Sequence, residues 1–297
     1  MTTTRQALRQ RIQNGSTFWF GGAQDALSAL LVDQSDFDGI FSTGFGISAA
    51  LLGQPDMEFY TLSENVATVN RMANVVKKPI FVDADTGYGN VLNMGRAVRE
   101  FEKAGAAALQ IEDQISPKRC PAAATSSTLV SVKDATARLK AALDARQDPD
   151  LLIVARTDAM DPSEALDRAA HYAEAGADLI QPISRTFNRY EQLVQLREVC
   201  GRRLALQLMA GTWMTSLTRV QIESVAAFAA YPIASLLTSV HAVQANLAEL
   251  ARRRSGDFAN LPFEQTTMAA FKELIGWHAL EERQAHYEAD VAAEPGR

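Results

Sequence analysis

The chain is poor in the residues that build disulfide and zinc scaffolds. Its 297 residues include two cysteines and four histidines. Two cysteines are too few for a disulfide framework and fit a reducing compartment. The histidines, at positions 171, 241, 278 and 286, do not have the spacing of zinc ligands. We therefore expect neither a disulfide scaffold nor a zinc site.

Long apolar runs and clusters of positive charge are also missing. The longest apolar run, Val225–Ile233, is interrupted by Pro232 and is far shorter than the roughly 20 residues of a membrane span. The first residues lack the apolar core of a secretion signal. The net charge is −6, and no basic patch with interleaved aromatic residues is present, which argues against a nucleic-acid partner. We expect a cytoplasmic protein without membrane or nucleic-acid partners.

The chain does contain a regular alternation of short apolar runs and amphipathic stretches. Expected strands lie near residues 17–20, 39–42, 79–83, 107–111, 151–156, 178–182, 203–207 and 226–231. Expected helices lie near residues 24–34, 62–76, 91–104, 132–146, 162–175, 188–199, 217–224 and 234–253. Eight such alternations in about 250 residues predict one closed α/β barrel of the (β/α)₈ type, with a doubly wound sheet as the alternative.

The end of the chain has a different pattern. Residues 262–274 and 277–289 show helical periodicity with no strand between them, Pro262 suits a first helical turn, and Gly276 separates the two segments. We assign residues 1–255 to a catalytic barrel and residues 256–297 to a helical extension. Because extra helices on a complete barrel need a surface to pack on, we expect the extension to contact a neighbouring subunit in a homo-oligomer.

Acidic side chains follow two neighbouring expected strands. Asp83 and Asp85 end one apolar run and Glu112 ends the next. Asp83 and Asp85 are two residues apart, so on a continuing strand both would point to one face. Carboxylate oxygens together with water are the ligands that Mg²⁺ prefers, which predicts a magnesium site. The alternative is that these acids are helix caps or solvated loop residues.

Two further features suggest acid–base and anion-binding chemistry. Cys120 follows Lys118 and Arg119, and neighbouring cations lower the pKa of an exposed thiol. Such a thiolate can accept a proton from a hydroxyl, and the thiol can return one to an enolate. Arg156 closes an apolar run and suits a substrate carboxylate, with a structural ion pair to Asp158 or Glu112 as the alternative.

Several motifs along the chain match one known family. They are Gly22-Ala-Gln-Asp25, Ser42-Thr-Gly44, Leu52-Gly-Gln-Pro-Asp56, Asp83-Ala-Asp-Thr-Gly-Tyr-Gly-Asn90, Glu112-Asp-Gln114, Pro117-Lys-Arg-Cys120, Ala155-Arg-Thr-Asp158 and Tyr231-Pro232. On these residues the chain resembles the isocitrate lyase/phosphoenolpyruvate mutase superfamily over nearly its whole length. The branch it resembles contains methylisocitrate lyase, dimethylmalate lyase and carboxyphosphoenolpyruvate mutase.

The resemblance implies a barrel, a tetramer with a helix swapped between neighbours, and Mg²⁺ (or Mn²⁺) chemistry through the enolate of an α-keto acid. The residues that it assigns are Asp83, Asp85 and Glu112 for the metal, with Asp56 nearby and mostly through water; Ser42, Thr43, Gly44, Asp56, Tyr88, Ile183 and Gln207 for the substrate; and Cys120, Arg156, Lys118 and Arg119 for catalysis. Cys120 would lie on a gating loop. We expect residues 115–128 to form this lid.

The chain departs from the family pattern on one side of the expected pocket. Pro121-Ala122 stands where the lyases continue with Gly-His, and Ile183 replaces a glutamate. Gln207 and Ala210 replace an asparagine and a second glutamate. A site that exchanges charged groups for Ile and Ala binds a charged substrate portion poorly, because the lost partners leave a desolvation cost. We predict a substrate other than isocitrate or methylisocitrate, with a neutral or apolar distal part.

The leading hypothesis is a Mg²⁺-dependent carbon–carbon lyase acting on a small 2-hydroxy acid and releasing a 2-keto acid. One alternative within the same fold is a P–C bond mutase or hydrolase, or an enzyme acting on oxaloacetate. A phosphate-binding arrangement near Arg156 and Lys118 would favour the phosphorus chemistry. A third alternative is a non-catalytic binding protein that retains the metal site.

Overall fold

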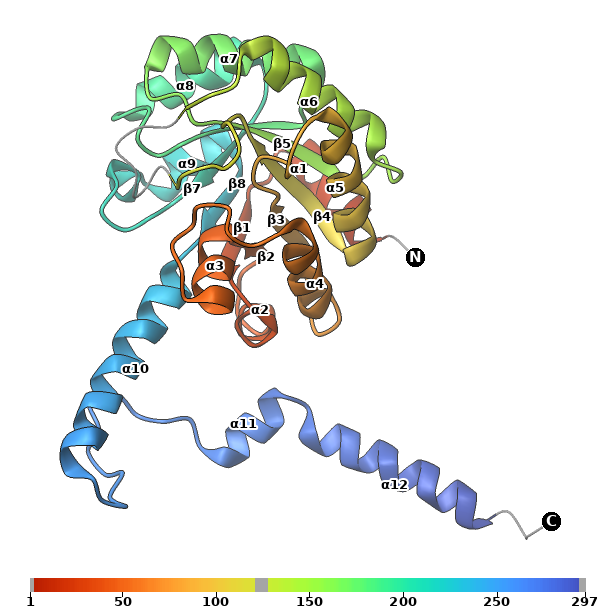
Figure 1. Cartoon of the computed structure of the whole chain (residues 1–297), viewed down its shortest axis with the longest axis vertical. Coiled ribbons are helices and arrows are strands. Elements are labelled where there is room, and N and C mark those ends of the chain that lie inside the picture. Colours follow the sequence, from red (N-terminus) through yellow and green to blue (C-terminus); the bar gives the residue numbers. More distant parts are fainter. Residues whose placement is uncertain (1–2, 121–127, 294–297) are drawn as a thin grey trace. The chain divides into compact units, whose positions relative to one another are not determined.

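The computed structural model describes residues 3–120 and 128–293, with side chains up to residue 289. Its centre is a barrel of parallel strands in sequence order (Figure 1). The strands are β1 (Phe18–Ala23), β2 (Gly39–Ser42), β3 (Ile80–Asp83), β4 (Ala106–Glu112), β5 (Leu152–Thr157), β6 (Leu179–Pro182), β7 (Leu204–Gln207) and β8 (Ala226–Tyr231). Because β8 pairs with β1, the barrel is closed, which confirms the predicted fold and excludes the doubly wound sheet.

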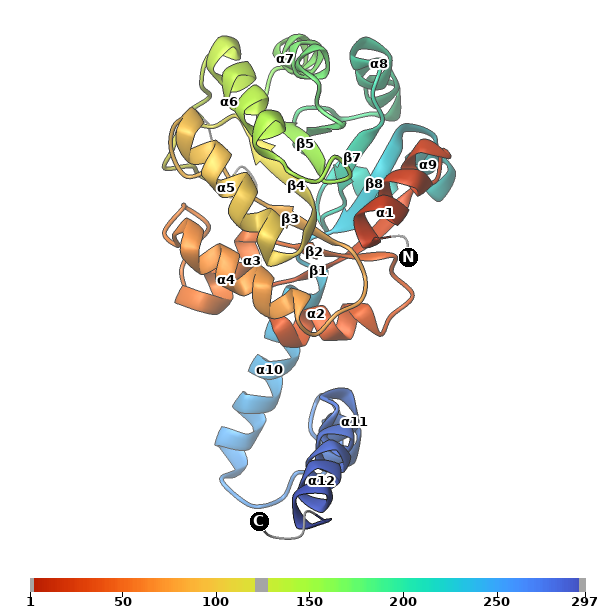
Figure 2. The same ribbon diagram turned by 90° about the vertical axis from the view of Figure 1, so that its right-hand side faces the viewer.

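Helices cover the outside of the strands, as Figure 2 shows for α4 to α8. They are α2 (Ala26–Asp33), α3 (Gly44–Leu52), α4 (Leu62–Ala73), α5 (Val91–Ala104), α6 (Val132–Ala145), α7 (Pro162–Ala175), α8 (Tyr190–Cys200) and α9 (Arg219–Val225), with a short 3₁₀ turn, η1 (Trp213–Ser216). Gly105 and Gly176 end α5 and α7 in the left-handed conformation, with φ of 106° and 108°. These caps place each following strand directly after its helix.

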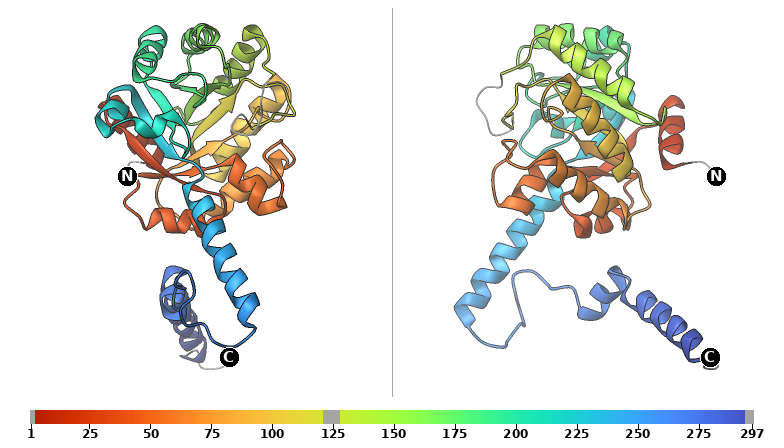
Figure 3. Two further views of the ribbon diagram at one scale, coloured as in Figure 1. Left: turned by 90° about the vertical axis from the view of Figure 1, so that its left-hand side faces the viewer. Right: turned by 45° about the vertical axis from the view of Figure 1, so that its right-hand side comes forward.

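Two helices were not predicted from the sequence. Helix α1 (Thr4–Gln13) is mostly polar, but it buries Leu8 against the barrel interior, and Arg5 Nε donates to the carbonyl of Ala106 at 2.8 Å. It therefore lies at the amino-terminal ends of the strands (Figure 3). Helix α3 begins with Gly44 and Gly46, which disfavour helix. Thr43 caps it by accepting a hydrogen bond from the backbone N–H of Gly46.

Aromatic rings fill the barrel interior on the side of the amino-terminal ends of the strands. Phe20, Phe41, Phe81 and Phe228 contact one another with ring centroids 4.8 to 5.6 Å apart. A second layer, of Ala, Val, Leu and Ile side chains, packs between the strands and the surrounding helices. Because apolar packing occupies the barrel toward the amino-terminal ends of the strands, polar side chains can gather at the carboxyl ends.

The chain divides into two compact units, residues 1–237 and 238–297. The division falls in the first turns of α10 (Ala234–Arg253), whereas the sequence placed it after residue 255, at the end of this helix. The second unit contains the rest of α10, α11 (Met268–Leu274) and α12 (Trp277–Ala293). Between residues 238 and 289 no side chain is buried. Across the described part of the chain, every helix is too short or too polar to span a bilayer.

The predicted helix from residue 262 to 274 was wrong over its first half. Helix α11 begins at Met268, where the Thr267 side chain accepts a hydrogen bond from the Ala270 N–H. Upstream, the side chain of Asn246 bonds both the N–H and the carbonyl of Phe263. These bonds hold the backbone after Pro262 outside a helix, so the proline precedes the helix without starting it.

Candidate active site

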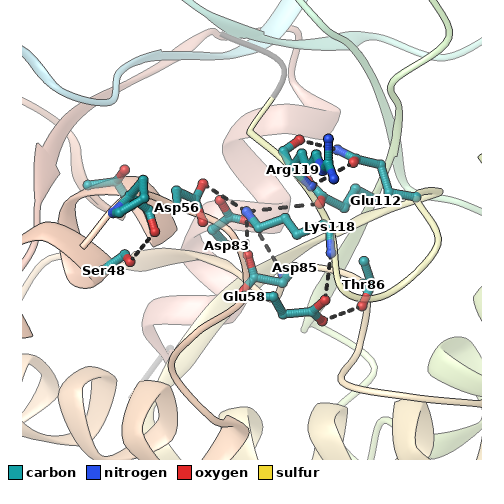
Figure 4. A network of polar contacts seen from close by, with 12 residues as sticks. Ser48, Asp56, Glu58, Asp83, Asp85, Thr86, Glu112, Lys118 and Arg119 are labelled. Atoms are coloured by element: carbon teal, nitrogen blue, oxygen red, sulfur yellow. Dashed lines mark hydrogen bonds and ion pairs between the residues drawn. The ribbon is translucent and has the colours of Figure 1, made fainter. Parts of the chain in front are cut away.

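The candidate site lies at the carboxyl ends of the barrel strands. Asp83 and Glu112 are the last residues of β3 and β4, and Arg156 lies near the end of β5. The loop after α3 contributes Asp56, and the loop after β4 contributes Lys118. Because the carboxyl ends of parallel strands meet at one end of a barrel, side chains far apart in the sequence converge here (Figure 4).

Asp85 reaches the site in a different way from the one predicted. Strand β3 ends at Asp83, and Asp85 has a left-handed backbone with φ of 50°, so the two acids are not on one continuing strand. Both carboxylates nevertheless approach Gly44. A Cβ on Gly44 would lie 3.1 Å from Asp83 Oδ2, 3.2 Å from Asp85 Oδ1 and 2.6 Å from the Tyr60 hydroxyl. The first residue of α3 must therefore be glycine for this approach.

The ammonium group of Lys118 lies among the carboxylates. Its Nζ is 2.7 Å from Asp85 Oδ1, 2.9 Å from Asp56 Oδ2 and 3.9 Å from Glu112 Oε1. Figure 4 shows the lysine between these acids. The Lys118 side chain is 1% exposed, so these charges interact with little solvent screening.

Hydrogen bonds fix the orientation of both Asp83 and Asp85. The hydroxyls of Tyr60 and Tyr88 donate to Asp85 Oδ2 at 2.6 and 2.7 Å. Gln110 donates to Asp83 Oδ1 at 3.2 Å and accepts from Gln207 at 3.0 Å. Tyr88 thus acts on the site through Asp85, and Gln207 reaches Asp83 through Gln110.

Arg156 forms ion pairs with both Glu112 and Asp158. From the sequence, such a pair was the alternative to binding a substrate carboxylate. The Arg156 Nη1 lies 3.0 Å from Glu112 Oε2, and its Nε and Nη2 donate to Asp158 at 2.7 and 3.1 Å. Asp158 is itself held by an N–H bond to Asp113, at 2.9 Å. A guanidinium has five N–H donors, so these three contacts leave donors for a ligand.

Burial makes the negative charge in the site costly. It raises the pKa of Asp83 to about 6, with Asp85 adding to the effect and Lys118 opposing it. Burial also raises the pKa of Asp56 and, more strongly, that of Glu112, although Lys118 and Arg156 partly offset both. For Lys118 burial alone would lower the pKa, but the surrounding carboxylates raise it well above its ordinary value. The acids outnumber their cations.

The residues present fit a hydrated magnesium ion better than a fully protein-bound metal. Among the described residues no three His, Cys, Asp or Glu side chains are placed to bind one metal ion directly. Four buried carboxylates, from Asp56, Asp83, Asp85 and Glu112, share two cations, Lys118 and Arg156, with Asp158. Mg²⁺ keeps several waters and commonly uses one or two carboxylates, so this surplus of acid oxygens suits it.

A cavity of about 180 Å³ opens beside these charges. Its polar lining comes from Thr43, Asp56, Asp83, Cys120, Arg156 and Gln207. Its apolar lining comes from Phe41, Phe45, Ile183, Met209, Pro232 and Ile233. We call these sets the polar wall and the apolar wall. The volume suits a small organic acid with one charged and one apolar end.

Seven of the fourteen predicted site residues line this cavity, and the other seven do not. Ser42 is buried next to Thr43, and its Oγ has no hydrogen-bond partner among the described residues. Arg119 has an exposed side chain, and its backbone N–H and carbonyl bond Gln114 at 3.0 and 3.1 Å. Ala210 is exposed and does not line the cavity. Tyr88 stands behind Asp85 and is not part of the lining.

The predicted lid, residues 115–128, falls largely outside the described residues. Pro121-Ala122 and the rest of residues 121–127 belong to that undescribed segment. At its base, the Ile115 N–H bonds the Thr128 carbonyl at 2.8 Å. The Cys120 N–H bonds the Asp56 carbonyl at 3.1 Å, and the Cys120 side chain lines the cavity. The lid itself stays a prediction.

Sequence reasoning missed several residues that shape the site. Glu58 bonds both the Lys118 N–H and the Thr86 hydroxyl, at 2.8 and 2.7 Å (Figure 4). Tyr60 orients Asp85, and Phe45 and Met209 belong to the apolar wall. The cluster of polar and aromatic residues between Asp56 and the Thr61 helix cap was an available signal. Phe45 and Met209 had no such signal, because their roles depend on how α3 and the segment after β7 meet in the fold.

Comparison with known proteins agrees with this geometry. The sequence model of the phosphoenolpyruvate phosphomutase family matches residues 8–254. The chain is 34% identical to 2,3-dimethylmalate lyase of Eubacterium barkeri over 272 residues, covering 90% of this chain and 92% of that protein. It is 35% identical to 2-methylisocitrate lyase of Aeropyrum pernix over 288 residues, covering 94% and 89%.

A solved structure gives the same result. Phosphonopyruvate hydrolase in complex with oxalate and Mg²⁺ superposes with a TM-score of 0.84 at 28% identity, covering 96% of this chain and 99% of that one. The chain therefore belongs to the phosphoenolpyruvate phosphomutase family, within the isocitrate lyase/phosphoenolpyruvate mutase superfamily. The predicted superfamily and the prediction that the chain is an enzyme are confirmed.

Proposed function

We propose that the protein is a Mg²⁺-dependent carbon–carbon lyase that cleaves a 2-hydroxy acid with a neutral or apolar substituent. The observation that carries this proposal is the cavity with its polar and its apolar lining residues. The polar wall offers Arg156 for a carboxylate and Cys120 for proton transfer. The apolar wall offers an alkyl group a dry surface and gives a further carboxylate, such as the third one of isocitrate, no partner.

The residues of the chain suit the steps of such a cleavage. Arg156 and the N-terminus of α3 at Thr43 bind the carboxylate next to the hydroxyl. Asp56, whose pKa is raised by burial, accepts the hydroxyl proton. The electrons of the C–C bond pass to the departing fragment, whose own carboxylate takes them up as an enolate. The hydroxyl carbon becomes the carbonyl of a 2-keto acid, and the Cys120 thiol protonates the enolate carbon.

Asp83, Asp85 and Glu112 would hold the Mg²⁺, mostly through water. When bound, the ion supplies positive charge that stabilises the developing enolate and the substrate oxygens. The support for this assignment is the surplus of buried carboxylates and the magnesium in the solved phosphonopyruvate hydrolase complex. The fixed orientation of Asp83 and Asp85 means that little reorganisation is needed.

The alternative chemistry on a phosphonate receives less support. A phosphonate group needs cations that are not already neutralised. Lys118 contacts Asp56 and Asp85, and Arg156 contacts Glu112 and Asp158. A doubly charged phosphonate would meet these carboxylates as well as the cations. A non-catalytic role is disfavoured because Cys120 and Arg156 both reach the cavity.

The test is a substrate panel with and without Mg²⁺. Alkyl-substituted malates, isocitrate, methylisocitrate, oxaloacetate and phosphonopyruvate are each incubated with the protein, and release of pyruvate, glyoxylate, oxalate or phosphate is measured. We expect 2-keto acid release from an alkyl malate that is lost on chelation of Mg²⁺. Efficient cleavage of isocitrate or methylisocitrate would contradict the predicted role of the apolar wall, and phosphate release would favour the phosphonate alternative.

We also propose that the second unit assembles with a second copy of the chain. In residues 238–289 no side chain is buried, and Val243, Leu247, Met268 and Leu280 are among its exposed apolar residues. In the first unit, Trp19 stacks on Tyr231, and Phe37 contacts Tyr231 at a tilted angle. These three residues help to line a hollow of about 720 Å³ near the pairing of β8 with β1. Light scattering should show an oligomer for the full chain and a smaller species for residues 1–255. A monomeric full chain would contradict the proposal.

A further inference from the structure

The buried ammonium of Lys118 lies at the point where the proposed magnesium ion would be held. It contacts Asp85 Oδ1 at 2.7 Å and Asp56 Oδ2 at 2.9 Å, and it lies 3.9 Å from Glu112 Oε1. These three acids come from three separate segments of the chain. The ammonium is thus the positive charge around which the carboxylates are arranged (Figure 4).

Asp85 has no second oxygen to give to a metal. Its Oδ2 already accepts hydrogen bonds from Tyr60 at 2.6 Å and Tyr88 at 2.7 Å. Its Oδ1 is the atom that contacts Lys118. A divalent cation that binds at Asp85, directly or through one water, must therefore take the oxygen that the ammonium now holds. Two cations a few ångströms apart in a buried site repel each other strongly.

Lys118 has another partner available when it leaves Asp85. It already contacts Asp56 Oδ2, and Asp56 Oδ1 is buried with no hydrogen-bond partner among the described residues. Its backbone is held separately, since the Lys118 N–H bonds Glu58 and the Cys120 N–H bonds the Asp56 carbonyl. The flexible side chain can move while the backbone on both sides stays in place.

We propose that Lys118 is an exchangeable counter-ion of the site. Without a divalent cation it neutralises Asp85; when Mg²⁺ binds, it yields the Asp85 oxygen and pairs with Asp56 alone. This inference rests on the proposed Mg²⁺ site and adds that metal binding and the Lys118–Asp85 ion pair exclude each other. Because coupling between two binding events is reciprocal, removing the ammonium must strengthen metal binding.

The test is the Mg²⁺ affinity of the variant Lys118→Met, measured by calorimetric titration with MgCl₂ in the absence of any substrate. We expect Lys118→Met to bind Mg²⁺ about tenfold or more tightly than the wild type. The matched control is Lys103→Met, which removes the same charge from an exposed lysine whose nearest acid is Glu100 at 3.4 Å. The control should bind Mg²⁺ as the wild type does.

The possible outcomes distinguish a failure of the counter-ion role of Lys118 from a failure of the proposed Mg²⁺ site. Equal or weaker binding by Lys118→Met, with clear binding by the wild type, overturns the counter-ion role and leaves the magnesium site standing. Binding by Lys118→Met alone supports the counter-ion role and contradicts Mg²⁺ dependence of the natural enzyme. If neither protein binds Mg²⁺, both proposals fail.

A stability measurement covers the case in which the variant folds poorly. Removing Lys118 leaves Asp85 and Asp56 buried without their cation, so metal-free Lys118→Met should unfold at a lower temperature than the wild type. Saturating Mg²⁺ should narrow this difference, because the metal replaces the lost charge. A variant that folds only with Mg²⁺ supports the inference, and one that gains no stability from Mg²⁺ overturns it.

Discussion

The two walls of the active-site cavity use their residues in opposite ways. On the polar wall, Asp83 and Arg156 are each held by at least two polar contacts, so their orientation is fixed before a ligand arrives. On the apolar wall, Phe45, Ile183 and Met209 present surface and no charge. Under the proposed function, the polar wall would determine which bond is broken, and the apolar wall would determine which substrate is accepted.

The largest effect should come from the proton donor of the polar wall. Cys120→Ser keeps the size of the side chain and removes an acidic thiol, so we expect kcat to fall by about 10²–10⁴-fold with a small change in KM. The matched control is Cys200→Ser, because Cys200 is buried at the end of α8, where its Sγ bonds backbone carbonyls. Steady-state kinetics measures both, and wild-type turnover by Cys120→Ser would remove the thiol from the mechanism.

The next effect tests the metal side of the polar wall. Asp85→Asn keeps the shape and removes the charge, so we expect Mg²⁺-dependent turnover to fall by about 100-fold or more and Mg²⁺ binding to weaken. The control is Asp167→Asn, an exposed aspartate on α7. Titration with Mg²⁺ and kinetics at saturating Mg²⁺ measure the change. Intact Mg²⁺-dependent turnover in Asp85→Asn would show that the metal assignment is wrong.

A third change turns part of the apolar wall polar. Ile183→Glu places a carboxylate at a position that is 7% exposed, among the apolar residues that line the cavity. We expect kcat/KM for an alkyl substrate to fall about tenfold or more, with no gain of isocitrate cleavage, because burying the carboxylate costs free energy and the other partner groups expected for isocitrate remain absent. Ile183→Val is the matched control and should change kcat/KM much less. Isocitrate cleavage by Ile183→Glu would contradict the need for several partner groups.

The smallest expected effect is the pH dependence of Mg²⁺ binding at the polar wall. Burial raises the pKa of Asp83 to about 6, so below that pH a proton competes with Mg²⁺ and affinity falls by up to about tenfold per pH unit. For the metal-free protein the sign is opposite: the folded state binds the proton more tightly, so Asp83 adds stability as the pH falls from about 6 toward 4. Calorimetry at several pH values measures the affinity. An unchanged Mg²⁺ affinity across this range would contradict the role of Asp83.

The comparison of the walls also explains what the sequence could reveal. The polar wall was predictable because strand-end acids, a cysteine after two cations and an arginine after an apolar run are local patterns. The eight strands were predictable for a similar reason, since their apolar runs alternate with amphipathic stretches. What failed were predictions that needed geometry, such as the left-handed backbone at Asp85 and the start of α11 at Met268.

The apolar wall was only partly predictable. Ile183 was identified because it departs from the family pattern. Its predicted effect on substrate choice came from the glutamate that it replaces. Phe45 lies on α3 and Met209 follows β7, and neither carries a local signal, because each becomes a cavity residue only when these separate segments meet in the fold. The role of Lys118 was also hidden, since sequence spacing does not show that its ammonium lies among Asp56, Asp85 and Glu112.

The aromatic packing inside the lower barrel has a kinetic consequence. Phe20, Phe81 and Phe228 fill the interior and Phe41 reaches up to line the cavity, so in the described structure the barrel offers no passage below the site. Under the proposed function, the two cleavage products would then leave through the same mouth by which the substrate entered. Such a dead-end chamber favours an ordered release, in which the fragment nearer the mouth departs first. Product-inhibition kinetics would show it as competitive inhibition by the fragment that leaves last and noncompetitive inhibition by the other.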